Sequence, residues 1–254
     1  MTPYPEEPWH LAGQMYLSLW LVPTRELPTV ADGTRPLTIA GRGAVGAAWV
    51  VYENDSVLHY NELLRAVLVR DGSRPRVCVT DIWVDSAASM AGGRELWGIP
   101  KEMADFAIDR TAGVRAAAAT GEDVLATAAF EPGRRIPGRW PLTYRVAQNL
   151  DGGLKTSSVR SRSTVRTARA RWTAQEGGPL RELGRRPPFL SLALNDFTLR
   201  FGDAAPAMSA PSGSIAPSPP APLSPPAPSA PLGPSGPSGP STPSAPTGTT
   251  TPNL

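Results

Sequence analysis

Amines are rare among the basic side chains of this protein. Of the 25 Lys and Arg among its 254 residues, 23 are Arg, and only Lys101 and Lys155 are Lys. We attribute this bias to a genome that favours Arg codons. A lysine that persists against it points to amine chemistry, because an amine can lose its proton and act as a nucleophile. Lys101 follows Pro100 among apolar residues, whereas Lys155 is predicted to lie in a glycine-rich loop.

Glu62 is the second candidate for chemistry, because it interrupts an apolar face. Its same-face neighbours on a predicted strand are Leu58, Tyr60, Leu64, Ala66 and Leu68. An unpaired buried carboxylate is costly, so Glu62 must be paired, protonated or exposed. Two interpretations stay open: a general acid or base beside Lys101, or a structural ion pair with Arg94.

Residues 41–46, Gly-Arg-Gly-Ala-Val-Gly, match the spacing of a dinucleotide-binding loop, and Glu62 follows at a suitable distance for a ribose contact. Such a loop needs a helix directly after it, whose N–H groups face the pyrophosphate. Residues 47–52 are instead β-prone. We therefore favour a glycine-rich strand edge over a nucleotide-binding oxidoreductase, and expect no organic cofactor.

Composition argues against several further classes. One cysteine, Cys78, leaves no disulfide framework and fits a reducing compartment, so we expect a cytoplasmic protein. No segment reaches the length of about 18 apolar residues that a membrane span needs, so no membrane partner is expected. His10 and His59 lack partners at ligand spacing, so no metal site is predicted.

Arginines recur on one predicted strand and raise the question of nucleic acid. The members of this tract are Arg160, Arg162, Arg166, Arg169 and Arg171. Alternate arginines on a strand are typical of one solvated face, and only Trp172 offers a base-stacking surface nearby. With a net charge of +3, we expect no nucleic-acid partner.

The hydrophobic periodicity is mostly two, which predicts strands. In 15–22, for example, Met15, Leu17, Leu19 and Leu21 alternate with a more mixed face. The predicted strands cover 15–22, 37–40, 47–52, 57–69, 76–84, 103–108, 114–120, 124–130, 142–147, 164–172 and 190–201. This pattern predicts a mostly β (α+β) protein with antiparallel strands and few helices.

One helix is predicted in the middle of the chain. Asp85 or Ser86 caps its start, and Gly98 followed by Pro100 ends it. Because Pro100 keeps the residue before it extended, the chain should leave this helix directly as a strand that carries Lys101. A short helical turn is also expected near 180–183.

Residues 92–104, Gly-Gly-Arg-Glu-Leu-Trp-Gly-Ile-Pro-Lys-Glu-Met-Ala, resemble the Gly-Arg-Glu and Pro-Lys segment of the acetoacetate decarboxylase family. Two weaker matches support the resemblance. Residues 8–13 resemble the family's opening strand, and Tyr60-Asn61-Glu62 resembles the segment that holds its active-site carboxylate. The resemblance extends over about 8–201.

The resemblance implies a cone-shaped β-barrel, a homo-oligomer, and a Schiff base between Lys101 and a small keto acid or ketone. A protonated imine is an electron sink, so carbon dioxide or a proton can leave the neighbouring carbon. The amine must first be neutral, although a free lysine has a pKa near 10.4. Glu62 would manage protons in this carbon–carbon lyase or decarboxylase-like enzyme.

Two departures separate this chain from the family's founding enzymes. Their reactive lysine is followed by a second lysine, whereas Glu102 stands here and should point to the opposite face of its strand. Gln14 falls about where the family carries an arginine for the substrate carboxylate, and an amide binds carboxylate less strongly. An apolar pocket would then have to keep the amine neutral, with Ile82, Val84, Trp97 and Met103 as its substrate-binding walls.

We therefore predict an acetoacetate decarboxylase-like domain over 1–203 and a disordered Pro/Ser/Ala-rich tail over 204–254, where 16 of the 30 prolines lie. The expected reaction is decarboxylation, aldol chemistry or dehydration through a lysine imine. A non-catalytic small-molecule binding protein of the same fold is the alternative, with the dinucleotide-binding oxidoreductase as a third hypothesis.

Overall fold

The computed structural model describes residues 2–203 of the chain, and the predicted tail over 204–254 lies outside the described residues. Strands dominate, as predicted. In chain order the elements are β1 (Trp9–Pro23), a 3₁₀ turn (Thr24–Glu26), β2 (Arg35–Pro36), β3 (Thr38–Ile39), β4 (Arg42–Tyr52), β5 (Tyr60–Asp71), β6 (Arg74–Val84), α1 (Ala87–Trp97), β7 (Lys101–Met103), β8 (Asp105–Asp109), β9 (Val114–Thr120), β10 (Asp123–Leu150), β11 (Gly153–Ala174), α2 (Arg181–Arg185) and β12 (Leu190–Phe201).

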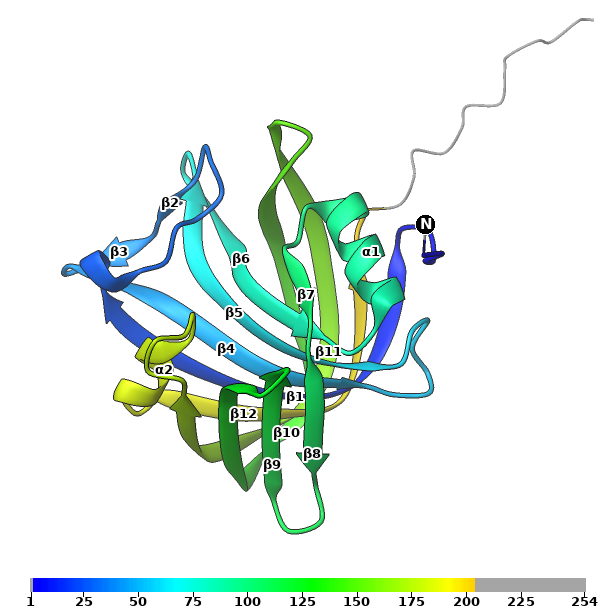
Figure 1. Cartoon of the computed structure of the whole chain (residues 1–254), viewed down its shortest axis with the longest axis vertical. Coiled ribbons are helices and arrows are strands. Elements are labelled where there is room, and N and C mark those ends of the chain that lie inside the picture. Colours follow the sequence, from blue (N-terminus) through cyan, green and yellow to red (C-terminus); the bar gives the residue numbers. More distant parts are fainter. Residues whose placement is uncertain (1, 204–254) are drawn as a thin grey trace, which may run out of the picture. The chain divides into compact units, whose positions relative to one another are not determined.

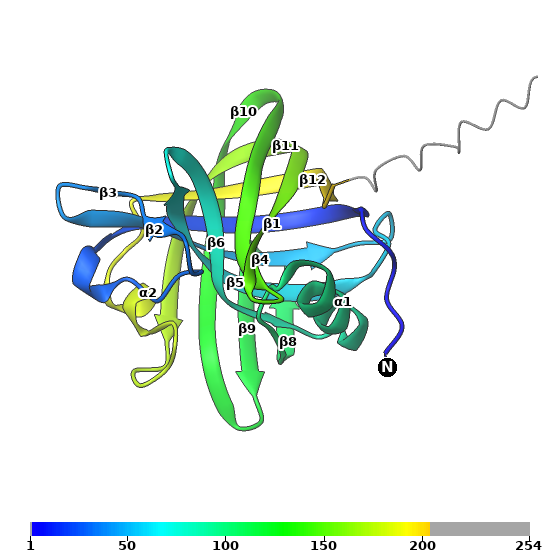
Figure 2. The same ribbon diagram turned by 90° about the horizontal axis from the view of Figure 1, so that it is seen from above.

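The strands form one strongly curved sheet in the order β7-β6-β5-β4-β1-β12-β11-β10-β9-β8 (Figures 1 and 2). Most neighbours are antiparallel, but β6 pairs in parallel with both β7 and β10. The second of these contacts, at Val77 and Val146, brings the sheet round to meet itself. The predicted class, mostly β with few helices, is confirmed.

The central strands are buried on both faces, which creates two hydrophobic cores. On β4, Trp49 packs into one core, while its neighbours Ala48 and Val50 pack into the other. On β1, Tyr16 and Trp20 enter the first core. The alternation predicted for 15–22 is therefore present, but the mixed face is the more buried one and Leu21 is 49% exposed. Local hydrophobicity therefore does not decide which face of β1 is the more buried.

The glycine-rich segment at 41–46 lies largely within β4, between β1 and β5. Gly43 packs against the side chain of Leu27, and Gly46 against that of Leu19. No helix follows this described segment, so it lacks the geometry that a phosphate-binding loop needs, and the dinucleotide-binding interpretation of 41–46 is wrong. The segment is also an interior strand rather than a sheet edge.

Helix α1 begins and ends as the sequence predicts. The Ser86 side chain accepts a hydrogen bond from the backbone N–H of Ser89, and Gly98 adopts a left-handed conformation at φ 65°. The N–H of Ile99 then donates to the carbonyl of Gly93, which completes the C-terminal cap. The chain passes through Pro100 into β7, so Lys101 opens a strand directly after the helix.

The strand predictions fail mainly in length. Two predicted strands, 124–130 and 142–147, belong to the single strand β10, which spans 28 residues and pairs with the 22-residue β11. Register shifts near Pro132 and Ile136 absorb the Pro and Gly residues that separated them in the prediction. The helical turn expected near 180–183 is α2, Arg181–Arg185.

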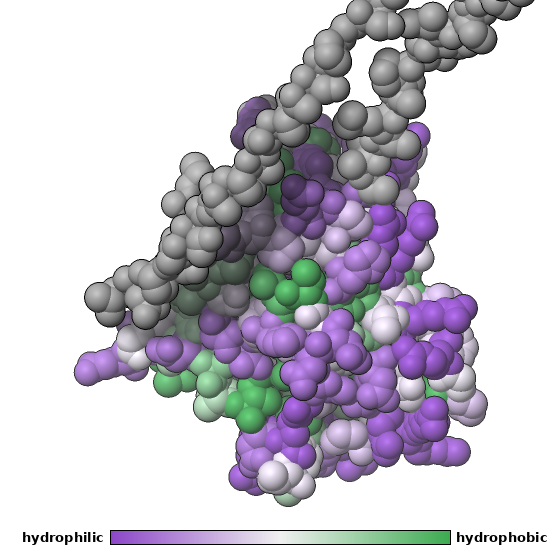
Figure 3. Space-filling view, turned by 90° about the vertical axis from the view of Figure 1, so that its right-hand side faces the viewer, coloured by the Kyte–Doolittle hydropathy of each residue, from purple (hydrophilic) through white to green (hydrophobic). Residues whose placement is uncertain are grey.

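The face that carries α1 and the N-terminal segment is mostly hydrophilic, with apolar groups in small separate patches (Figure 3). None of the described helices is long and apolar enough to cross a membrane.

We expect Gly98→Ala to destabilise the protein by at least about 3 kcal/mol. An added methyl group would collide with the backbone of Asn149 and would also be held at a positive φ. Gly121→Ala is the matched control, because Gly121 has φ 60° but open space around it, and should cost only about 1 kcal/mol. Urea denaturation of both variants measures the difference, and equal costs would contradict the proposed close packing of α1.

Candidate active site

Lys101 is buried at the point where α1, β6 and β7 meet. It is 4% exposed, and it pairs in register with Ile82 of β6. The Arg94 guanidinium donates a hydrogen bond to the Lys101 carbonyl at 2.7 Å, which ties the last turn of α1 to β7. Gly93 faces the Lys101 side chain so closely that a Cβ there would lie 2.7 Å from Lys101 Cδ. The glycine therefore leaves the space through which the lysine side chain passes.

The Lys101 ammonium has three oxygen partners. Its Nζ lies 2.9 Å from Glu62 Oε2, 2.8 Å from Ser89 Oγ and 3.3 Å from the Tyr60 hydroxyl. It also lies 5.0 Å from the centre of the Tyr60 ring. An ammonium group has three N–H donors, so these contacts satisfy it completely in its protonated form.

Glu62 of β5 is equally buried, at 3% exposed, and its two oxygens have different partners. Oε2 accepts from Lys101, and Oε1 accepts from the Tyr52 hydroxyl at 3.1 Å. Tyr52 and Tyr60 pair across β4 and β5 with their ring centres 4.4 Å apart. Glu62 thus forms its ion pair with Lys101, whereas Arg94, the partner considered in the sequence analysis, binds a backbone carbonyl.

The protonation of Lys101 differs from the expectation of a neutral amine. Burial is the largest influence on Lys101 and lowers its pKa, but the charge of Glu62 and the hydrogen bonds of Glu62 and Tyr60 together outweigh it. The net pKa of Lys101 is therefore raised. The prediction that an apolar pocket keeps the resting amine neutral is wrong, because the nearby carboxylate stabilises the ammonium. Glu102 plays no part in this, since it is exposed on the other face, as predicted.

The tyrosines around Glu62 are held in their neutral form. Burial, followed by the charge of Glu62, raises the pKa of Tyr144 to about 12 and that of Tyr52 well above its usual range. Burial also raises the pKa of Tyr60, although Lys101 opposes it. Tyr52 and Tyr60 can therefore donate hydrogen bonds to the site without adding negative charge.

A cavity of about 80 Å³ opens beside this pair, and its walls are mainly apolar and aromatic. The residues that line it are Trp9, Leu11, Met15, Tyr52, Tyr60, Glu62, Leu64, Ala66, Val77, Val79, Ile82, Trp97, Ile99, Lys101, Tyr144, Val146, Leu199 and Phe201. The predicted set Tyr60, Glu62, Leu64 and Ala66 shares this face. An apolar cavity with a few convergent polar groups is the usual form of a small-molecule site.

The five predicted substrate-binding residues divide into two groups. Ile82 and Trp97 line the cavity. Val84 is buried in the same core but is not among the lining residues. Met103 is 42% exposed, because β7 is a three-residue strand at the edge of the sheet. Gln14 lies elsewhere, and Met15, the next residue of β1, faces the cavity in its place.

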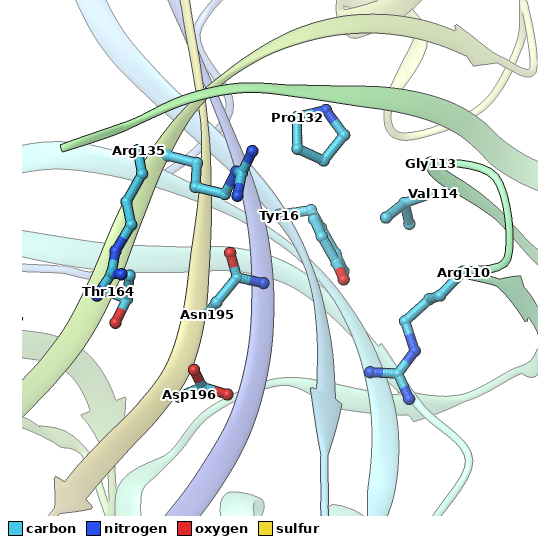
Figure 4. Close-up of a pocket in the computed structure, with 10 residues that line it drawn as sticks. Tyr16, Arg110, Gly113, Val114, Pro132, Arg135, Thr164, Asn195 and Asp196 are labelled. Carbon is cyan, nitrogen blue, oxygen red and sulfur yellow. The ribbon is translucent and has the colours of Figure 1, made fainter.

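Gln14 belongs to the opposite face of β1. Its side-chain amide donates to Glu53, and its oxygen accepts from Asn195. Asn195 in turn lines a groove of about 580 Å³, in which Tyr16, Arg110, Arg135 and Asp196 are also seen (Figure 4). Arg110 forms an ion pair there with Glu53, with 2.6 Å between Nη1 and Oε1. None of the described residues that line this groove is a lysine, so it offers no amine for a Schiff base.

Sequence reasoning missed Ser89, Tyr52 and Tyr144. Ser89 reaches Lys101 only because α1 docks over β7, a tertiary contact with no local signal. Tyr52 had a weak signal, since a short turn joins β4 and β5 and places it opposite Tyr60. Within residues 2–203, no three His, Cys, Asp or Glu side chains gather in a group that could hold a metal.

A family model described as acetoacetate decarboxylase matches residues 34–183. The chain belongs to this family. The match includes both Glu62 and Lys101. No curated protein matches the sequence.

Solved structures with this fold include other members of the family. An acetoacetate decarboxylase from Legionella pneumophila is 16% identical, with 80% of this chain and 88% of that chain covered and a TM-score of 0.56. An acetoacetate decarboxylase-like enzyme from Sphingomonas wittichii is 16% identical, with 80% and 95% covered and a TM-score of 0.52.

The enduracididine biosynthesis enzyme MppR has the same fold. Its complex with the condensation product of pyruvate and imidazole 4-carboxaldehyde is 18% identical to this chain, with 79% and 88% covered and a TM-score of 0.52. At this level of identity these likenesses show the fold alone.

We expect the Lys101 and Glu62 substitutions to be strongly non-additive. Lys101→Met or Glu62→Leu alone leaves one buried charge without its partner and should cost roughly 3–5 kcal/mol, whereas the double variant should cost less than the sum. The contribution of Lys101 should persist below about pH 10.4, the pKa of an unfolded lysine, and fade as the pH rises through the higher folded value.

Urea denaturation of the wild type, both single variants and the double variant, at pH 8 and pH 11, measures these differences. Additive costs, or a Lys101→Met cost that grows between pH 8 and pH 11, would contradict the ion pair.

Proposed function

We propose that the protein is a Schiff-base-forming lyase, in which Lys101 attacks the carbonyl carbon of a small keto acid or ketone. The observation that carries this proposal is the contact between a fully buried lysine and a fully buried carboxylate at the edge of an apolar cavity. Buried ionisable pairs at the edge of a cavity are typical of catalytic sites. The family match over both residues supports the assignment.

Proton transfer within the pair can supply the neutral amine that the reaction needs. Nζ and Oε2 are 2.9 Å apart, within the range of a hydrogen bond along which a proton can move. Transfer leaves an amine and a carboxylic acid, and it removes both charges from the buried site. The protonated resting state can therefore react, because transfer of one proton to Glu62 converts the ammonium into the nucleophilic amine.

The balanced reaction returns the carboxylate to its starting form. The amine adds to the carbonyl carbon, and the carboxylic acid of Glu62 gives its proton to the carbonyl oxygen. The nitrogen, which carries two protons after the addition, then gives one of them through Glu62 to the new hydroxyl group. The hydroxyl group leaves as water, and the nitrogen remains as a positively charged iminium. The net change is one ammonium and one ketone converted into one iminium and one water, with Glu62 again negative.

Tyr52, Tyr60 and Ser89 are positioning residues in this scheme. Tyr52 holds Oε1 of Glu62, which leaves Oε2 directed at the lysine nitrogen. Ser89 and Tyr60 hold the two remaining N–H groups. The iminium then withdraws electrons from the neighbouring carbon, so decarboxylation, aldol chemistry or dehydration can follow. The MppR complex with a condensation product of two carbonyl compounds fits the same kind of chemistry.

Borohydride reduction in the presence of a panel of ketones, aldehydes and keto acids should trap a covalent adduct on Lys101, identified by mass spectrometry of peptides. Lys155 is the internal control: it lies at the surface beside Glu7 and outside the cavity, so it reports the background reaction and should be modified far less than Lys101. Glu62→Gln should slow trapping by roughly 10²–10⁴-fold, the usual contribution of a general acid or base.

A folded protein that gives no Lys101 adduct with any carbonyl compound would overturn the proposed function. The non-catalytic alternative makes a different prediction, namely that a ligand binds with similar affinity after Lys101→Ala. Calorimetric titration of that variant with the trapped compound distinguishes the two. The expectations of a homo-oligomer and a cytoplasmic location stay predictions.

A further inference from the structure

We infer that the Lys101 cavity accepts an uncharged aldehyde or ketone in preference to a keto acid, and that its first chemical product is an enamine formed by loss of an α-proton. This inference rests on the proposed Schiff base. It concerns the substrate class, which the family match does not decide for this chain.

Charge is the first argument. Among the described residues that line the cavity, Lys101 and Glu62 are the only ones whose side chains carry a charge at neutral pH, and they neutralise each other. The remaining side chains there that can form hydrogen bonds are the tyrosines and the indoles of Trp9 and Trp97, all of them uncharged, and no arginine or histidine is among the lining residues described. A substrate carboxylate in this cavity would therefore find no cation of its own.

The charges in the site after imine formation differ between the two classes of substrate. With a neutral ketone, the iminium carries one positive charge, and Glu62 carries one negative charge beside it. With a keto acid, the same iminium would face two carboxylates in a site shielded from water. An unpaired buried charge is costly, so the cavity favours the neutral substrate.

Gln14 does not reach the cavity, so it cannot bind a substrate carboxylate there. Its side chain is directed to Glu53, Asp196 and Asn195 on the other face of β1. The β1 residue that faces the cavity is Met15, which is apolar. Met15 lies in a regular stretch of pairing between β1 and β4, opposite Val50, so the alternation of the strand sets its direction.

Size and surface agree with a small apolar carbonyl compound. The cavity of about 80 Å³ is walled on several sides by aromatic or aliphatic groups, among them Trp9, Trp97, Leu64 and Phe201. Short alkyl groups on either side of a carbonyl would replace water against these walls. Burial of apolar surface then contributes to binding without any ionic contact.

Without a carboxylate to lose, the electron sink acts on a C–H bond. The iminium withdraws electrons, the α-carbon releases a proton, and the electron pair of that C–H bond becomes the C=C bond of an enamine. The proton goes to the carboxylate of Glu62, which is negative again once the iminium has formed. The balance is one iminium and one carboxylate converted into one neutral enamine and one carboxylic acid, with no further reactant.

Butanone and 2-oxobutanoate form a matched test pair, because a methyl group in the first takes the place of the carboxylate in the second. In D₂O, proton NMR follows the exchange of the α-protons of each compound with the full chain. We expect butanone to exchange at least about tenfold faster, and we expect Lys101→Met to abolish the enzymatic exchange of both. Lys155→Gln is the control for lysine substitution and should leave exchange unchanged.

A cation added to the wall should reverse the preference. Met15→Arg places a guanidinium at the cavity, so 2-oxobutanoate should gain at least about tenfold relative to butanone. Met15→Leu is the size-matched apolar control and should retain the wild-type preference. Urea denaturation of both variants shows that each is folded.

The outcomes separate this inference from the proposed function. Exchange of 2-oxobutanoate by the wild type at a rate equal to or above that of butanone would overturn the inference, even if Lys101 is trapped as an imine. Absence of exchange for both compounds, while borohydride still traps Lys101 with another carbonyl compound, would also overturn the inference alone. Absence of any trapped imine would overturn the proposed function and the inference with it.

Discussion

The buried contact between Lys101 and Glu62 is the constraint around which this structure is arranged. Two opposite charges at 2.9 Å, each at most 5% exposed, are tolerable only when every remaining hydrogen-bonding group has a partner. Tyr52 supplies that partner for the carboxylate, and Ser89 and Tyr60 supply it for the ammonium. Replacing one member leaves the others without their partner, so the site behaves as a unit.

Distant segments must come together to build this unit. Glu62 comes from β5, Tyr52 from β4, Ser89 from the first turn of α1 and Lys101 from the start of β7. Only Gly98, Ile99 and Pro100 separate α1 from β7, so the helix packs against the strand that follows it. Gly93 then leaves room for the lysine side chain beneath the helix. The helix is also tied to the sheet, because Arg94 binds the carbonyl of Lys101.

Local signals predicted the two ionisable residues and the strand-rich class. Lys101 stands after a proline bend, and Glu62 interrupts an apolar alternation that the structure preserves on β5. The helix ends were also predictable, since Ser86 and Gly98 are strong capping residues. These features depend on a few neighbouring residues, so the sequence shows them directly.

Features that depend on tertiary arrangement were not predictable. Val79 and Ile82 line the same cavity although they lie three residues apart, because β6 has an extra residue at Thr80 relative to β5. The exposure of Met103 depends on the position of β7, a three-residue strand at the edge of the sheet. The raised pKa of Lys101 escaped prediction for the same reason, since it depends on the approach of Glu62 across the sheet.

The chain has only two lysines, so NMR of protein labelled with ¹³C at lysine Cε should show two side-chain signals, Lys101 and Lys155. Titration of these signals reads the ionisation of Lys101 directly. The account predicts that Lys101 stays protonated at neutral pH and loses its proton only above the pH at which an ordinary lysine does. It also predicts that Glu62→Gln moves this transition to lower pH, because burial then acts without the opposing carboxylate. A wild-type Lys101 that is already neutral at pH 7, or a transition that Glu62→Gln leaves in place, would contradict the central role of the ion pair.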